Sequence, residues 1–535
     1  MRTVLPRGAL HTIPAMSARE DSPSHPRRWL TLMAMTGSLS MIMLDSTVVG
    51  VALPTIQADV GLGAEGRGWV VNGYLLALAS FLALGGRIGD VIGRPNAFRA
   101  GMVGFMLASI GCGVAQEPWQ LVIGRIAQGV CAAIMQPASA AIVTDSFAPG
   151  ERGKAMAAYA GISLLFLAAG PVIGGAIIEA ASWRWVFWLN LPIAAASLAL
   201  SSRVGLPSTK RAPRPVDALS VALILAGMPL LIGGLQSVAS RGWDAPAPWV
   251  LAGAGALLML TFTHRQWRLS AHGRALIDLP MLRDRGLLGD CLTLFFIQFA
   301  TIGQTIFLSI YFQDALGLDP LRAGIATLPL LVPVLIVIHV AGRMYDRVGV
   351  RTPVLIGLAL SVSGVAVEVA GIATGTYPVI AAGMALLGTG LGFAMTPTNT
   401  DALSRVDPAR RGEASGILNS FRQVGSSLGL AFMVVIVGIL TQASFSSLVG
   451  ERSLSSHPDR SSELVTRALG GDLAAAEQLA SRAPEIAQAA ADARRRGMVT
   501  GFAAQCASMG LALAAAISLV RPPTRGHGVP ATPTT

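Results

Sequence analysis

Two charged residues lie inside long apolar stretches, and their types could do chemistry there. Asp45 falls in the run 29–56 and Arg125 in the run 119–143. A carboxylate in a bilayer is costly, so its neutral form is favoured and it could take up and release a proton near neutral pH. An uncompensated guanidinium is also costly, which makes Arg125 the candidate partner. The two residues therefore predict a proton-coupling site.

Each of these residues also has a structural interpretation. Asp45 could be a partly hydrated carboxylate that anchors neighbouring helices, and Arg125 could cap backbone carbonyls and hold its own span in place. Glu368, also inside an apolar run, is interpreted as structural. The polar residues proposed to line a substrate cavity are Gln128, Gln298, Gln304, Asn419 and Arg422. Each glutamine or asparagine could instead bond a neighbouring helix, and Arg422 could stabilise an interface between two halves.

The composition indicates that lipid is the solvent for much of this chain. Of 535 residues, 53% are hydrophobic and only 13% are charged, whereas a soluble globular chain carries roughly 25% charged residues. The four cysteines all lie in apolar stretches and are interpreted as packing residues. No Cys/His cluster has metal-ligand spacing, no GxxxxGK[ST] loop is present, and no nucleophile–base pair is evident. We therefore expect no metal site, no catalytic residue and no cofactor.

Fourteen apolar stretches are long enough to cross a hydrocarbon core about 30 Å thick. They run near 29–56, 69–86, 97–115, 119–143, 155–180, 185–202, 216–237, 248–267, 287–312, 322–342, 351–374, 377–402, 412–441 and 497–520. The predicted fold class is an all-α membrane protein of about fourteen transmembrane helices. Its architecture is two six-helix bundles plus two inserted helices.

The distribution of basic residues orients these spans. With the N-terminus in the cytoplasm, 27 of the 40 Lys and Arg fall in predicted cytoplasmic segments and four fall in short outer loops. This positive-inside bias explains the net charge of +11 without a nucleic-acid partner, and it places both termini in the cytoplasm. The exception is 494–496, three arginines next to the last span on its predicted outer side.

An internal repeat supports two related halves. The sequence GRIGDVIG at 86–93 recurs as GRMYDRVG at 342–349, each copy in a predicted short cytoplasmic loop. The glycines permit a tight turn, and Asp beside Arg can latch neighbouring helices; alternatively, any such loop favours Gly, Asp and Arg. The residues assigned to a conformational switch are Gly86, Asp90, Gly93, Arg94, Gly342, Asp346 and Gly349.

The predicted domain boundaries follow from the spans and the repeat. They are 1–28 for a cytoplasmic tail, 29–202 for the N-terminal half, 203–286 for a linker with the two extra helices, 287–521 for the C-terminal half and 522–535 for a second tail. The C-terminal half includes a predicted extracytoplasmic loop at 442–496. An Ala-rich stretch within it, 473–493, is predicted to be helical and could form a small hairpin.

The fifth predicted span combines small residues with a proline. Gly170, Pro171, Gly174 and Gly175 give it a face that permits close helix approach and a missing backbone hydrogen bond. This combination suits a helix that bends or rocks during transport. Ordinary tight packing explains the same residues equally well.

Several motifs together resemble the major facilitator superfamily, in its branch of fourteen-span drug–proton antiporters. The repeated loop resembles the family signature, LDSTVVGVALP at 44–54 resembles a first-span motif, and RIAQG at 125–129 a fourth-span motif. GPVIGG at 170–175 is similar to the fifth-span motif associated with export, and WRWVFWLNLP at 183–192 to the entry of the sixth span. The resemblance covers about 30–440.

The resemblance implies a function and marks some departures. It implies proton movement tied to Arg125, export tied to the fifth span, and a peripheral place for the span of Glu368. Gly50 stands where the family usually has Asn, and Val91 and Pro95 stand where a basic residue is common. The latch in the first loop could therefore be weaker, or its positive partner could be Arg94 or the neighbouring arginine at 87.

The sequence thus predicts a proton-coupled exporter of amphipathic small molecules that works by alternating access in a bacterial cell membrane. Its expected partners are the small-molecule substrate, protons and the bilayer, and no nucleic-acid partner is expected. The chain is expected to be monomeric, and the sequence does not decide whether accessory efflux subunits are needed. The alternative is a facilitated uniporter or importer of a nutrient, which would ignore a pH gradient. A membrane enzyme or an ATP-driven pump finds no supporting motif.

Overall fold

The computed structural model describes residues 27–62, 64–148, 151–206, 217–241, 245–272, 275–406, 411–454 and 484–520. Within these ranges the chain is almost wholly helical and contains no strand. The N-terminal helices are α1 Arg28–Val60, α2 Ala64–Ile92, α3 Arg94–Gly113, α4 Pro118–Ser146, α5 Arg152–Ala180, α6 Arg184–Trp188 and α7 Asn190–Val204. A central pair, α8 Ala218–Arg241 and α9 Pro246–Ser270, is followed by the 3-10 turn η1 Leu279–Arg283. The C-terminal helices are α10 Arg285–Asp314, α11 Pro320–Ala326, α12 Leu328–Val348, α13 Arg351–Thr374, α14 Tyr377–Ser404, α15 Arg411–Leu454 and α18 Pro484–Leu519.

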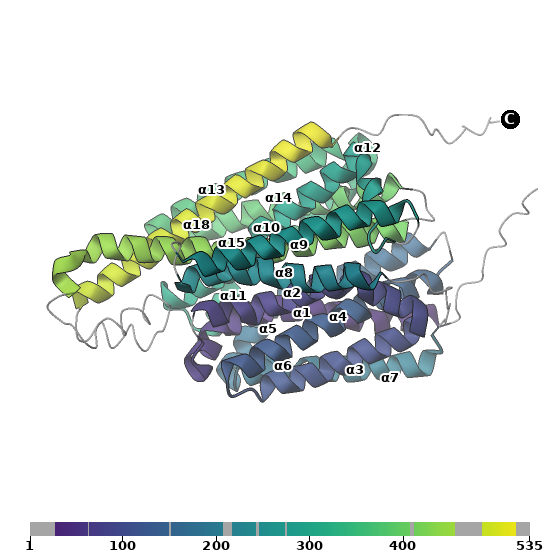
Figure 1. Cartoon of the computed structure of the whole chain (residues 1–535), viewed down its shortest axis with the longest axis horizontal. Helices are drawn as coiled ribbons and strands as arrows, with labels where there is room; N and C mark the ends of the chain where they lie inside the picture. The colour runs from purple at the N-terminus through teal and green to yellow at the C-terminus, as the bar shows by residue number, and fades with distance from the viewer. Residues whose placement is uncertain are drawn as a thin grey trace, which may run out of the picture.

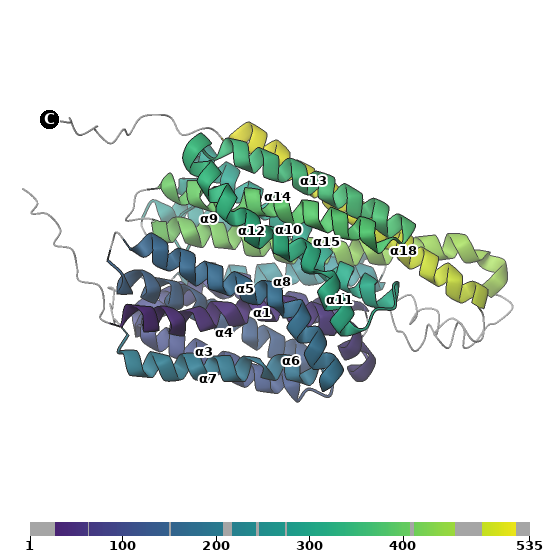
Figure 2. The same cartoon turned by 180° about the vertical axis from the view of Figure 1, so that it is seen from behind.

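The helices run side by side along the long axis of the molecule (Figure 1). Helices α1 to α7 pack mainly on one another, and so do α10 to α18. The pair α8–α9 lies between these two groups, because α8 contacts α2 of the first and α15 of the second. The start of α1 and the end of α18 lie toward the same end of the molecule (Figure 2).

Twelve helices in the described part of the chain are long and apolar enough to cross a membrane, so this is a multi-pass membrane protein. The predicted number of fourteen is not confirmed. Helix α2 offers only a shorter apolar segment, Gly68–Leu82, and α3 is not among the twelve. Both helices nevertheless pack along α4.

Two helices extend into the segment 442–496 that the sequence predicted as a loop. Helix α15 continues to Leu454 and α18 begins at Pro484, and their ends extend beyond the other helices (Figure 1). Only 455–483 of this segment lies outside the described residues, so the predicted helix 473–493 is seen only in its second part. Arg494 lies 3.7 Å from Asp314 at the end of α10. This ion pair accounts for a basic residue where the charge bias did not place one.

Close helix approach depends on glycine at the position that matters most for the site. A Cβ added to Gly129 of α4 would come within 2.4 Å of the Tyr74 carbonyl oxygen on α2. Only glycine therefore lets α4 lie against the α2 backbone there. Gly129 follows Arg125 by one helical turn, so this contact brings the Arg125 side chain against α2.

The start of α8 is tied to the last part of α9 by an ion pair. Asp217 precedes α8 and accepts from the Ser220 backbone N–H at 2.9 Å, and its two oxygens accept from Arg265 at 2.7 Å each. The Arg265 guanidinium, followed by the Ser220 bonds, holds the pKa of Asp217 below its usual range, although burial opposes this. The carboxylate therefore caps α8 and links it to α9.

We expect Asp217→Asn to lower the thermal melting temperature by a few degrees, equally at about pH 5 and about pH 8. A lowered folded-state pKa stabilises above the ordinary carboxyl pKa of about 3.9 and is lost only in stronger acid. Melting of the purified protein followed by intrinsic fluorescence measures this. Glu179→Gln, at an exposed carboxyl group near the end of α5, is the control. A difference that vanishes at pH 5 would contradict the assignment.

Candidate functional site

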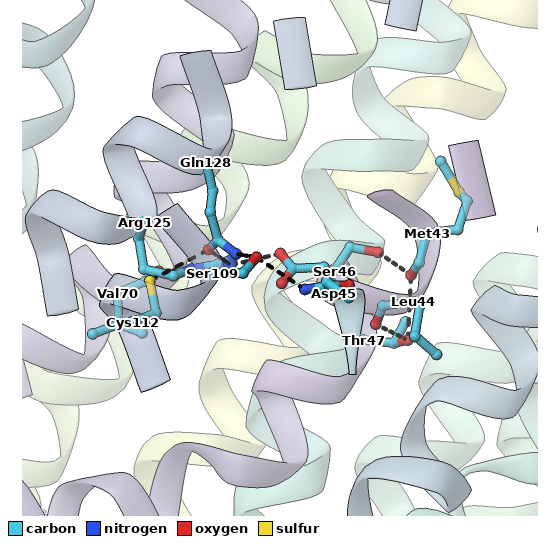
Figure 3. Close-up of polar contacts among 11 residues, drawn as sticks. Met43, Leu44, Asp45, Ser46, Thr47, Val70, Ser109, Cys112, Arg125 and Gln128 are labelled. Carbon is cyan, nitrogen blue, oxygen red and sulfur yellow. Dashed lines mark hydrogen bonds and ion pairs between the residues drawn. The ribbon is translucent and has the colours of Figure 1, made fainter. Parts of the chain in front are cut away.

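The buried ion pair between α1 and α4 is the centre of the site (Figure 3). Nη1 of Arg125 lies 2.5 Å from Oδ2 of Asp45, and each side chain is only 1% exposed. These residues are 80 positions apart in the chain. The two intramembrane charges singled out in the sequence are thus brought into direct contact, and each compensates the charge of the other.

Helix α2 holds the other side of the Arg125 guanidinium. Its Nε donates to the Val70 carbonyl oxygen at 2.9 Å, and its Cζ lies 4.4 Å from the centre of the Tyr74 ring. The Phe187 ring of α6 lies 5.9 Å away. Because a carbonyl and aromatic faces also attract a guanidinium, Arg125 would keep partners if Asp45 lost its charge.

A chain of neutral polar groups leads from the ion pair toward α3 and α7. Arg125 donates to Oε1 of Gln128 at 2.8 Å, and Nε2 of Gln128 donates to Oγ of Ser109 at 2.7 Å. Nδ2 of Asn190, the first residue of α7, lies 3.4 Å from the same hydroxyl. All are buried. The network ties the orientation of Arg125 to four helices besides its own: α1, α2, α3 and α7.

The ion pair uses only one of the two Asp45 carboxylate oxygens. Oδ1 of Asp45 has no hydrogen-bond partner among the described residues, so one carboxylate oxygen is unoccupied. Protonation would cancel the charge that holds Arg125 and weaken the link between α1 and α4. The arrangement thus couples the charge of one carboxyl group to the contact between two helices.

Helix α1 also packs closely on α5, through the glycines of the predicted export helix. A Cβ on Gly170 would come within 2.0 Å of Oγ1 of Thr47, and one on Gly174 within 3.0 Å of Cγ1 of Val48. The Thr47 hydroxyl donates to the Leu167 carbonyl oxygen at 3.2 Å. Thr47 and Val48 follow Asp45 directly, so α5 rests on the same turn of α1 that carries the carboxylate.

The next glycine of α5 joins the two groups of helices. A Cβ on Gly175 would come within 2.4 Å of the Pro320 carbonyl oxygen, and one on Gly324 within 2.2 Å of the Pro171 carbonyl oxygen. We call this the α5–α11 contact. It lies where α5 ends and α11 begins, the side predicted to be outside (Figure 2). Tight packing of these glycines is therefore real, and it occurs at a boundary between the two groups.

The repeated loops use their last glycine in the same way. Gly93 has φ of 90° and Gly349 has φ of 79°, values that favour glycine. Arg94 of the first loop forms an ion pair with Asp145 at the end of α4. The side chain of Asp90 lies outside the described residues. Gly86 and Gly342 have open surroundings or ordinary contacts.

The second loop is latched differently. Asp346 is exposed and has no ion-pair partner in the described part of the chain. The ion pairs at this end instead involve Arg405, whose Nε lies 2.5 Å from Asp401 and 3.7 Å from Asp290. They join α14 to α10. The matched loops therefore share their turn but not their ionic partners.

We expect Arg94→Gln to reduce stability by about 1–3 kcal/mol, because it leaves the half-buried Asp145 carboxylate without this cation. Thermal melting of the purified protein in detergent would measure the change. Arg347→Gln, an exposed arginine in the corresponding loop, is the matched control and should change little. Equal effects from the two substitutions would show that the Arg94 pair adds nothing specific.

The residues proposed to line a cavity lie in three kinds of place. Gln128 and Gln304 are buried, so neither borders an open cavity in this conformation. Gln298 donates to Ser426 at 3.3 Å and Asn419 to the Ser415 carbonyl oxygen at 3.1 Å, both in part-buried surroundings. Nε of Arg422 is buried without a partner in the described chain.

The sequence interpretation missed several members of the site. The Val70 carbonyl carries no signal in the sequence, because any residue has one. Tyr74 and Ser109 are single polar residues inside apolar runs, a weak signal that only their pairing makes meaningful. Asn190 lay within a quoted motif but was given no role.

A bundle of this kind, with repeated loops and a buried ion pair between its first and fourth long helices, is that of a multi-pass membrane transporter. The Major Facilitator Superfamily profile matches residues 35–430. The chain belongs to this superfamily.

Relatives of established or assigned function are resistance and export proteins. The puromycin resistance protein pur8 of Streptomyces alboniger is 34% identical over 79% of this chain and 84% of its own length. The tetracenomycin C resistance and export protein of Streptomyces glaucescens is 31% identical over 81% and 79%. A probable actinorhodin transporter of Streptomyces coelicolor is 33% identical over 85% and 79%.

Solved structures share the fold at low identity. A bacterial homologue of the human lysosomal transporter Spinster has a TM-score of 0.64 and 16% identity, covering 93% of this chain and 98% of that one. The D-xylose–proton symporter has a TM-score of 0.55 and 16% identity, covering 83% and 95%.

Proposed function

We propose that this protein is a proton-coupled exporter of amphipathic small molecules across a bacterial cytoplasmic membrane. The observation that carries the proposal is the buried Asp45–Arg125 pair, an acid that can be protonated next to the cation that its charge holds. The resistance and export proteins among the relatives support the direction of transport and the class of substrate. Both termini lie in the cytoplasm in this proposal.

The contacts suggest how protonation moves helices. A proton taken up by Asp45 from outside releases Arg125 toward Val70 and Gln128, which loosens α1 from α4. Helix α1 carries α5 with it through Thr47 and Val48, and α5 ends at the α5–α11 contact. Proton uptake thereby favours separation of the two helix groups on the outer side, where substrate leaves. After the outer side has closed again, the proton leaves to the cytoplasm and the ion pair re-forms.

Transport in proteoliposomes tests the proposal. The purified chain is reconstituted into proteoliposomes and a pH gradient is imposed. Uptake of puromycin and of tetracenomycin C is followed through the molecules whose cytoplasmic side faces outward. We expect accumulation that collapses when a protonophore removes the gradient. Counterflow at the same rate with and without the gradient would identify a facilitated uniporter instead.

A further inference from the structure

One carboxylic acid in the C-terminal helices takes no part in the site above. Glu368 lies in α13 and is 0% exposed. Its Oε2 accepts a hydrogen bond from Nε2 of Gln304 on α10, and its Oε1 has no partner in the described chain. Within those residues it has no ion-pair partner either. A carboxylate buried in this way, without a cation, would be far more costly than the neutral acid.

In the described part of the chain, the helices packed around α13 supply no ion-pair partner for Glu368. Gly383 of α14 packs directly on the Glu368 side chain, since a Cβ there would come within 2.7 Å of its Cγ. Tyr311 of α10 donates to the Ile372 carbonyl at 3.4 Å, and Cys506 of α18 contacts the Val362 carbonyl at 3.5 Å, so both are engaged elsewhere. Among the described residues, Glu368 forms no ion pair with any charged or titratable side chain of the neighbouring helices α10, α12, α14 and α18. These side chains are Arg285, Asp290, Asp314, His339, Arg343, Tyr345, Asp346, Arg347, Tyr377, Asp401, Asp492, Arg494, Arg495 and Arg496.

The two halves differ in how they neutralise a buried acid. The repeated loops align the two halves. Glu368 follows Gly349 by 19 residues (368 − 349), and the corresponding residue of the first half, 19 after Gly93 (112 − 93), is Cys112. In the first half, Arg125 of α4 balances Asp45. In the second half, the corresponding helix α14 has no lysine or arginine along Tyr377–Ser404. Because α14 supplies no cation, a bound proton can neutralise Glu368 instead.

The hydrogen-bond inventory fits the protonated acid. A carboxylate can only accept, so it would leave Oε1 of Gln304 and Oε1 of Glu368 both unpaired, as they are now. A protonated Glu368 has one O–H to donate, and the amide oxygen of the same Gln304 is an unused acceptor. The neutral acid and the amide can thus form two hydrogen bonds with each other, which leaves no polar group of the pair without a partner.

We propose that Glu368 and Gln304 form a second proton-binding site, separate from Asp45 and occupied in this conformation. Helix α10 links it to α1. A Cβ added to Gly50 of α1 would come within 3.6 Å of Cγ1 of Ile306, and Nε2 of Gln313 donates to the Val51 carbonyl oxygen at 3.1 Å. Movement of α1 relative to α10 would therefore alter the Gln304–Glu368 contact and the proton affinity of the acid. The site requires neither the direction nor the substrate proposed above.

Infrared spectroscopy of the full chain in lipid vesicles tests this directly. At neutral pH, the wild-type spectrum minus that of Glu368→Gln should contain the C=O stretching band of one protonated carboxylic acid. In Gln304→Leu the band should persist but move to higher frequency, because the acid has lost its hydrogen-bonded partner. Size-exclusion chromatography confirms that each variant is folded.

Two results would contradict the proposed proton site at Glu368 and Gln304. A difference spectrum with the two carboxylate bands and no acid C=O band would show that Glu368 is ionised and would overturn the proposal. If Glu368→Gln does not fold, Gln304→Leu compared with the wild type decides alone. An unshifted acid band in that variant would show that Gln304 does not hold the proton-bearing group.

Discussion

Asp45→Asn should abolish export driven by a pH gradient while leaving the protein folded in the membrane. The amide has nearly the shape of the carboxyl group and keeps an oxygen that can accept from Arg125, but it cannot bind or lose a proton. Arg125 also keeps the Val70 carbonyl, Gln128 and the Tyr74 ring. We expect gradient-driven uptake into proteoliposomes to fall to the level of protein-free vesicles.

The chain offers a matched control on the same helix. Asp59 of α1 also pairs with an arginine, Arg184, at 2.6 Å, and accepts from the Trp183 indole at 2.9 Å. Its side chain is 45% exposed, so Asp59→Asn removes the same charge at a solvated site. This variant should retain most transport. Full gradient-driven transport by Asp45→Asn would rule out Asp45 as the coupling carboxyl group.

Variants of Arg125 separate charge from shape. Arg125→Leu leaves Asp45 buried without its cation, so the acid is expected to stay protonated and transport to stop. Adding Asp45→Asn to that variant removes the stranded acid. The double variant should recover the stability lost by Arg125→Leu, measured by thermal melting, without recovering transport. Recovery of both would mean that the pair is only structural.

The sequence predicted the class of fold because the constraint is severe. A chain in lipid must satisfy its backbone within helices, so apolar length alone reveals most spans. Apolar length does not reveal how the spans pack on one another. Helix α2 packs on α4 and α8, and its contact with α4 depends on Gly129, which no measure of span hydropathy records.

The site was predictable in its charges and not in its geometry. Asp45 and Arg125 stood out because each is expensive alone, which also suggested that they meet. The residues around them are ordinary: Tyr74 and Ser109 gain a role only from helix packing. Glu368 was interpreted as structural because its span is peripheral in related proteins. Its isolation from every cation in the described chain depends on contacts between distant helices, and spacing along the chain does not encode these.

Gly324→Ala should hold the two helix groups apart at the α5–α11 contact and reduce transport strongly. The added methyl group would lie 2.2 Å from the Pro171 carbonyl oxygen, a backbone atom that cannot turn aside. Overpacking of this kind costs about 1–3 kcal/mol. Because the strain exists only when the groups are in contact, the same energy shifts the balance toward the separated state by roughly 5–150-fold.

Distances between spin labels would measure this shift. Labels at Glu179 of α5 and Arg322 of α11, both exposed, report the separation in a background without the native cysteines. Gly161→Ala is the matched control, since the same change on α5 meets nothing within 4 Å. We expect the distances between the labels to be longer in Gly324→Ala and unchanged in the control.

The two variants together distinguish a gate from simple packing. If the α5–α11 contact only stabilises the fold, Gly324→Ala should lower the melting temperature and transport without changing the label distances. If the contact opens during transport and Asp45 controls it, Asp45→Asn should also lengthen the distance, because its neutral side chain mimics the protonated acid. If the distance is longer in Gly324→Ala but unchanged in Asp45→Asn, the α5–α11 contact opens independently of the charge of Asp45. The route through Thr47 and Val48 would then be wrong, although the gate itself would stand.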